Sequence, residues 1–61
     1  MDRRDKIKKI LEESKDALKG IELGKLFGVS RQVIVQDISI LRAEGEEIIA
    51  TPNGYIIFKN N

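Results

Sequence analysis

The chain has 61 residues with 41% hydrophobic content and a formal net charge of +1, which suits one small domain near the lower size limit for a self-sufficient core. It contains neither cysteine nor histidine, and this composition excludes disulfides, thiolate metal sites and histidine-based catalysis within residues 1–61. We therefore expect no catalytic, metal or cofactor site. No apolar run approaches membrane-spanning length and the charged start lacks a signal peptide, so we expect a cytoplasmic protein without a membrane partner.

The first predicted helix runs from residue 2 or 3 to residue 14. Ile7, Ile10 and Leu11 repeat at the spacing of one helix face, and most of the remaining positions are charged. The segment that follows, residues 15–19, is predicted to be a connection. A short strand over residues 18–20 would be able to pair with a later hairpin.

Residues 20–45 have the pattern of a helix-turn-helix. A helix over residues 21–27 and a second over 31–43 or 31–44 are separated by a glycine turn. Gly28 can take the positive φ that ends a helix, and Ser30 can accept a hydrogen bond from an N–H in the first turn of the second helix. These signals predict two helices crossed at the angle that offers the second one to a DNA major groove.

The two helices are expected to bury specific apolar positions. Ile21, Leu23 and Leu26 are predicted to form the apolar side of the first, while Gly24 leaves room for the second to cross closely. Val29 is predicted to fill the space between the helices. On the second helix the spacing assigns a core face made of Ile34, Ile38 and Leu41, and Gly45 is predicted to end that helix.

The opposite face of this second helix carries uncharged hydrogen-bonding side chains, where a purely solvated face usually carries Glu and Lys. Glutamine can bond adenine through its amide, valine can meet a thymine methyl group, and arginine can bond guanine or a phosphate. We therefore predict contacts to double-stranded DNA from residues of this helix, its cap and the hairpin turn: Ser30, Arg31, Gln32, Val33, Val35, Gln36, Ser39 and Asn53.

Several of these residues also admit an ordinary structural interpretation. The glutamines can be solvated helix residues. Of Val33, Val35 and Ile40, at least one is expected to pack against the hairpin, and the others can mark a surface for a protein partner. Asp37 would repel phosphate if it faced DNA, so we expect it to form an ion pair with a basic residue of the first helix or with Arg42.

The hydrophobic period then changes from helical to strand-like. Residues 48–51 and 55–58 are β-branched and aromatic runs separated by Pro52-Asn53-Gly54, which predicts a hairpin with Gly54 at positive φ. Three helices followed by a hairpin are the order of a winged helix. We therefore predict a mainly α fold with a small β-hairpin, a single winged helix-turn-helix domain over residues 1–61.

The segment SRQVIVQDISILRAEGEEIIATPNGY resembles the N-terminal domains of bacterial nicotinate-responsive transcriptional repressors, within the wider class of biotin operon repressors. In those repressors a three-histidine effector domain follows the DNA-binding domain. The chain departs from their pattern with Phe27 for leucine, Gly24 for alanine, Glu46 for an aromatic residue and Asn53 for arginine. The matching residues are Phe27, Gly28, Val29, Ser30, Arg31, Asp37, Ile38, Leu41, Arg42, Gly45, Gly54 and Tyr55.

The resemblance implies the DNA-reading domain of a repressor, either a fragment or a stand-alone chain, with residues 31–43 in the major groove and the hairpin on the DNA backbone. The alternatives are a winged helix that binds proteins and a regulatory domain linked to an enzyme; none makes these residues an enzyme. Few apolar residues are surplus to the core, so we expect a monomer in isolation that pairs on DNA or through an effector domain.

Overall fold

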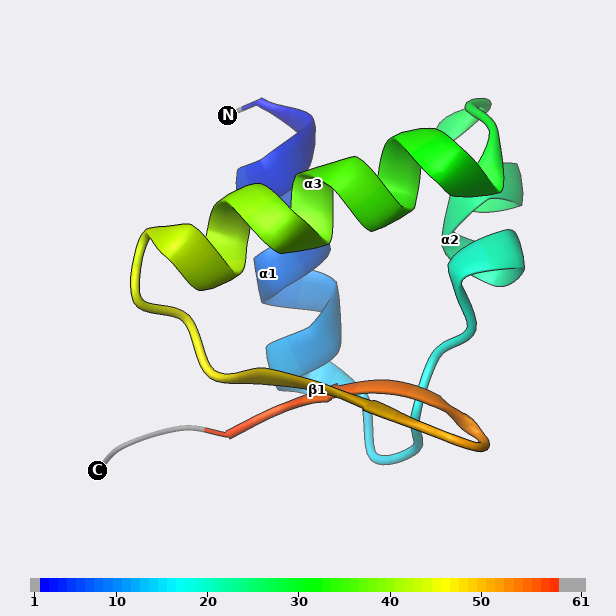
Figure 1. The fold of residues 1–61 in the computed structure, drawn as a ribbon. Coiled ribbons are helices and arrows are strands. Elements are labelled where there is room, and N and C mark those ends of the chain that lie inside the picture. The colour runs from blue at the N-terminus through cyan, green and yellow to red at the C-terminus, as the bar shows by residue number, and fades with distance from the viewer. Residues whose placement is uncertain (1, 59–61) are drawn as a thin grey trace.

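The computed structural model describes residues 2–58, which form three helices followed by a two-stranded antiparallel hairpin. In Figure 1, α3 crosses in front of α1, α2 lies beside the start of α3, and the hairpin runs beneath α1. The predicted winged helix-turn-helix is confirmed. No helix in the described part of the chain is long and apolar enough to cross a membrane. The elements are α1 (Arg3–Glu13), α2 (Gly20–Phe27), α3 (Arg31–Ala43), β1 (Ile48–Thr51) and β2 (Gly54–Ile57).

Local hydrogen bonds explain where the helices begin and end. The Asp2 carboxylate accepts from the N–H of Asp5 at 3.0 Å at the start of α1, and the Ser30 hydroxyl accepts from the N–H of Val33 at 3.3 Å at the start of α3. Gly28 ends α2 with a φ of 69°, a conformation that favours glycine. Each predicted helix boundary therefore lies within one residue of the observed one.

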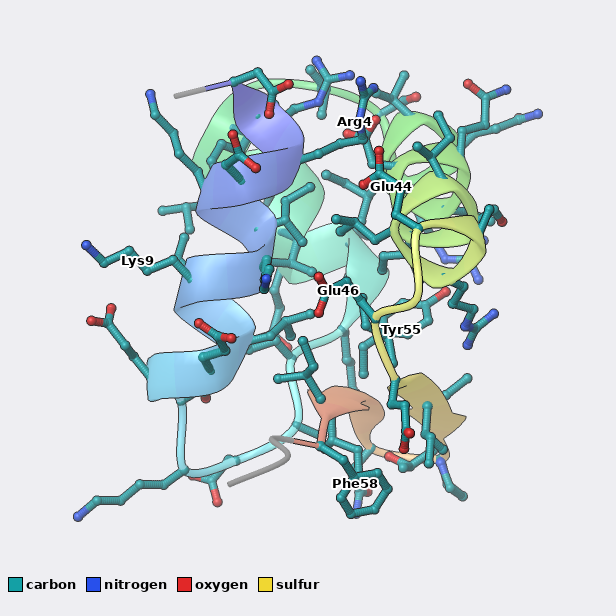
Figure 2. All side chains as sticks on the ribbon, turned by 90° about the vertical axis from the view of Figure 1, so that its left-hand side faces the viewer. Arg4, Lys9, Glu44, Glu46, Tyr55 and Phe58 are labelled. Atoms are coloured by element: carbon teal, nitrogen blue, oxygen red, sulfur yellow. The ribbon has the colours of Figure 1, made fainter. Side chains whose placement is uncertain are left out.

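The core lies where the three helices and β1 meet. Figure 2 views the molecule with α1 on one side of this core and α3 on the other. Val29 and Tyr55 are partly buried against the core, and the predicted core face of α3 is confirmed. The buried apolar side chains are Ile7, Leu11, Leu23, Ile34, Ile38, Leu41 and Ile48.

The predicted apolar side of α2 is wrong at two of its three positions. Leu23 is 1% exposed, but Ile21 and Leu26 are 53% and 63% exposed. The buried side of α2 instead includes Gly20 and Gly24 beside Leu23. At about 100° per residue, Ile21 and Leu26 point about 110° to either side of the centre of this face, which explains their exposure.

The hairpin is joined to the segment before α2. β1 and β2 pair with Ile49 opposite Ile56 and Thr51 opposite Gly54. Leu18 forms a bridge to Tyr55, with N–H to carbonyl distances of 3.0 and 2.7 Å, so the predicted short strand is present as a single bridge. Gly54 has a φ of 129°, which confirms the predicted positive φ. This bridge holds the hairpin turn near the start of α2.

Ion pairs tie α1 to the rest of the fold. The Lys8 ammonium lies 2.9 Å from the Glu46 carboxylate, and this hydrogen-bonded contact raises the pKa of Lys8. Glu46 stands where the resembling repressors commonly carry an aromatic residue, and here it joins the loop after α3 to α1 through this ion pair.

Candidate nucleic-acid interface

The exposed face of α3 brings together three of the predicted contact residues. Gln32, Gln36 and Ser39 are all exposed and follow one another at helical spacing. The Ser39 hydroxyl donates to the Val35 carbonyl at 3.1 Å, whereas neither glutamine side chain takes part in a hydrogen bond within the described residues. The two amides are therefore available to an external partner.

The other predicted residues are distributed around this face. Arg31 is exposed at the start of α3, and Val33 and Val35 are half-buried on its two flanks. Ser30 is exposed, but its hydroxyl already caps α3. Asn53 is exposed at the hairpin turn, where its backbone N–H donates to the Thr51 hydroxyl at 3.2 Å.

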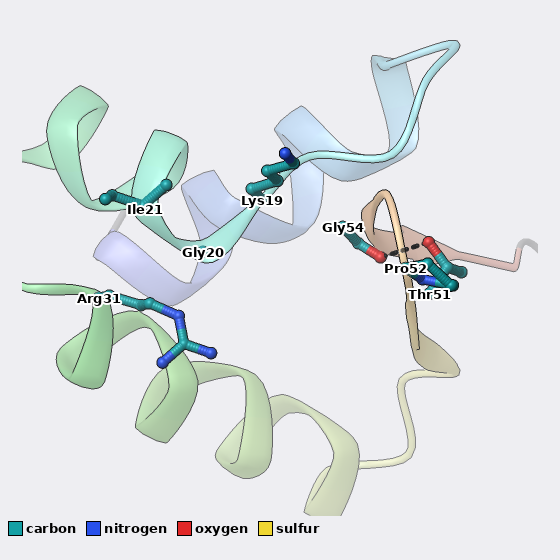
Figure 3. Close-up of a pocket in the computed structure, with 7 residues that line it drawn as sticks. All are labelled: Lys19, Gly20, Ile21, Arg31, Thr51, Pro52 and Gly54. Carbon is teal, nitrogen blue, oxygen red and sulfur yellow. Dashed lines mark hydrogen bonds between the residues drawn. The ribbon is translucent and has the colours of Figure 1, made fainter.

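A pocket of about 360 Å³ lies between the start of α2, the start of α3 and the hairpin turn (Figure 3). Its cationic residues, Lys19 and Arg31, form no ion pair among residues 2–58. The aliphatic part of Arg31 passes close to Gly20, where a Cβ would lie 3.3 Å from the Arg31 Cγ. The lining residues are Lys19, Gly20, Ile21, Arg31, Thr51, Pro52 and Gly54.

The start of α2 adds hydrogen-bond donors to this pocket. The N–H of Lys19 donates to the Glu22 carboxylate at 2.9 Å, but the first N–H groups of a helix, here those of Gly20 and Ile21, have no partner within the helix. Together with the positive end of the helix dipole, they favour an anion. Lys19 was not among the predicted contact residues, although its place two positions before the predicted start of α2 was the available signal.

Asp37 is directed away from the exposed face of α3. Its side chain is only 3% exposed and accepts hydrogen bonds from Nε and Nη2 of Arg3, the second at 3.3 Å. These hydrogen bonds raise the pKa of Arg3. The prediction of an ion pair with the first helix is confirmed, whereas the alternative partner was wrong: Arg42 donates from Nε to the Ile48 carbonyl at 2.8 Å.

The arrangement is chemically suited to bind a polyanion with exposed hydrogen-bonding edges. Cations and backbone N–H groups can hold phosphates, and side-chain amides can reach base edges. In the described part of the chain, no three His, Cys, Asp or Glu residues are grouped so as to hold a metal ion.

Comparison with known proteins gives consistent results. A family profile described as an HTH domain matches residues 3–56. The "Probable transcription repressor NiaR" of Thermotoga maritima is 53% identical over 51 residues, which are 84% of this chain and 29% of that protein. The "Transcription repressor NadR" of Bacillus subtilis is 57% identical over 54 residues, 88% of this chain and 30% of that protein. The matched region thus spans less than a third of either relative.

Proposed function

The chain belongs to the helix-turn-helix family whose profile matches residues 3–56, and we propose that it is the sequence-specific DNA-reading domain of a transcriptional repressor. Its similarity to two transcription repressors and its resemblance to the nicotinate-responsive group support this role. On this proposal residues 1–61 act as one domain in the bacterial cytoplasm, by binding rather than by catalysis.

The exposed face of α3 is the observation that carries the proposal. Gln32 and Gln36 present amides without a hydrogen-bond partner among residues 2–58, and a major groove admits an α-helix whose side chains reach base edges. The pocket cations Lys19 and Arg31 lie next to this face and are suited to a DNA phosphate.

The proposed contacts divide into two groups. Gln32, Gln36 and Ser39 would meet base edges, and Val33 and Val35 would meet thymine methyl groups. The second group positions the domain on the DNA backbone, and its members come from the start of α3, the start of α2 and the hairpin turn: Ser30, Arg31, Lys19 and Asn53.

Replacing Gln36 tests base recognition. Gln36→Ala should weaken binding to a site selected from random duplexes by about 1–3 kcal/mol, with a much smaller loss on random DNA. Arg31→Gln is the comparison variant, because loss of a phosphate contact should weaken both complexes about equally. Equal losses on both DNAs for Gln36→Ala would contradict base recognition by this face.

A protein-binding role has weaker support on α3. Ile40 is 41% exposed, whereas Val33 and Val35 are half-buried, so the apolar anchor would be small. A stable interface generally buries at least about 1,000 Å² with an apolar centre. We therefore propose that the chain is a monomer in isolation and pairs on DNA or through a further domain.

A further inference from the structure

A second cationic group lies at the start of α1, beside the buried Asp37. Arg3 makes both hydrogen bonds to the Asp37 carboxylate. The Arg4 guanidinium lies 3.8 Å from Asp37 and 3.9 Å from Asp2, distances too long for hydrogen bonds. Its side chain is 37% exposed, and no hydrogen bond within residues 2–58 engages its N–H groups. The Arg4 guanidinium therefore stays near two carboxylates, and its N–H groups remain accessible to an external acceptor.

Arg4 and the pocket cations lie on opposite flanks of α3. At about 100° per residue, Arg31 is about 60° to one side of the buried Ile34 and Asp37 is about 60° to the other. Figure 2 looks along α3 and shows Arg4 at its upper left, on the side of α1, whereas Tyr55 of the hairpin lies below α3. The exposed glutamine face points away from Ile34, between the two flanks.

We propose that Arg4 contacts a DNA phosphate on the backbone across the major groove from the one held by the Arg31 pocket. An α-helix with its side chains is about 10–12 Å wide and the major groove is about 12 Å wide, so a helix seated there brings both flanks close to a backbone. A cation on each flank then fixes the rotation of α3 in the groove. The proposal rests on the proposed function and adds a residue and an orientation to it.

Lys9 provides the matched control. It lies on the same helix and is exposed, and Figure 2 shows its side chain directed away from α3. Arg4→Gln and Lys9→Gln each remove one positive charge from α1. The two variants differ in where the charge lay relative to α3 and in the ion-pair contacts of Arg4 with Asp2 and Asp37, which a melting measurement monitors.

The experiment measures binding of the 61-residue chain to a fluorescently labelled duplex of random sequence by anisotropy, between about 50 and 200 mM salt. Arg4→Gln should lower the slope of log affinity against log salt by about 0.9 and weaken binding at the lower salt by about two- to fivefold. Lys9→Gln should change neither quantity appreciably. Both variants should melt near the midpoint of the unmodified chain, because the Arg4 side chain makes no hydrogen bond within the described residues and Asp37 keeps its hydrogen bonds to Arg3.

Each other outcome has a distinct meaning. Equal changes of the salt slope in the two variants would mean that the charge of α1 acts without a specific phosphate contact. An unchanged slope and affinity in Arg4→Gln would show that Arg4 is not at the interface. Either outcome overturns the proposal and leaves the proposed DNA binding in place. A melting midpoint lowered in Arg4→Gln with no change in the salt slope would make Arg4 a structural residue only and would also overturn it. Absence of any binding by the unmodified chain would refute the proposed function itself.

Discussion

Replacing Gly54 with alanine tests the contact between the hairpin turn and the segment before α2. Gly54 has a φ of 129°, beyond the left-handed helical region, and a residue with a side chain held in such a conformation costs about 1–3 kcal/mol. A Cβ at this position would also lie 2.5 Å from the carbonyl carbon of Leu18, 2.6 Å from its oxygen and 2.8 Å from the N of Lys19. These are backbone atoms, so the clash requires the hairpin and the segment to separate.

The backbone strain and the clash together predict a large loss of folding stability. Overpacking of this kind costs about 1–3 kcal/mol, so Gly54→Ala should lower the free energy of unfolding by about 2–6 kcal/mol in total. Separation would also weaken the two hydrogen bonds between Leu18 and Tyr55. A domain of this length is expected to have a total stability of about 3–9 kcal/mol, so the variant would lose much of it.

Gly28→Ala is the control for a positive φ without crowding. Gly28 also has a positive φ, 69°, but no atom lies within 4 Å of the place of its Cβ. This variant should lose only about 1–2 kcal/mol. Urea denaturation followed by far-ultraviolet circular dichroism measures both losses. If Gly54→Ala costs no more than Gly28→Ala, the close approach of the hairpin to Leu18 contributes nothing, and the reasoning fails.

Three further predictions concern the helix caps and the state of assembly. Ser30→Ala should lower the free energy of unfolding by about 1 kcal/mol, because the N–H of Val33 loses its acceptor, and Ser30→Asp should restore it in the same urea titration. The N–H of Asp5 and the nearby charge of Arg4 lower the pKa of Asp2 below 3.8. The Asp2 carboxylate therefore stabilises the fold above pH 3.8 and loses this effect as the pH falls through the lowered pKa, so the stability gap to Asp2→Asn should close in acid. A gap that persists at the lowest pH would assign the effect to another cause. Sedimentation equilibrium at micromolar concentration should find a single species of 6.9 kDa, and a dimer mass without DNA would contradict the proposed monomer.

The sequence alone determined the elements and their ends. Gly28 and Ser30 mark the turn between α2 and α3, and Pro52-Asn53-Gly54 marks the hairpin. Such signals work because caps and turns depend on groups only a few residues apart along the chain. The core face of α3 was also predictable, since a helix of 13 residues repeats its apolar spacing often enough to define one side.

The tertiary structure decided which side of α2 is buried and which charged groups meet. With eight residues, α2 has about two turns, and its apolar residues repeat too few times to define one buried side. Ile21 and Leu26 were therefore assigned to the core from their apolar character, although both are exposed. The pairing of Asp37 with Arg3 rather than Arg42, and the presence of Lys19 and Arg31 at one pocket, depend on how distant segments pack. Arg3 and Asp37 are 34 positions apart in the chain and Lys19 and Arg31 are 12 apart, and no local preference of the backbone encodes the distance between them.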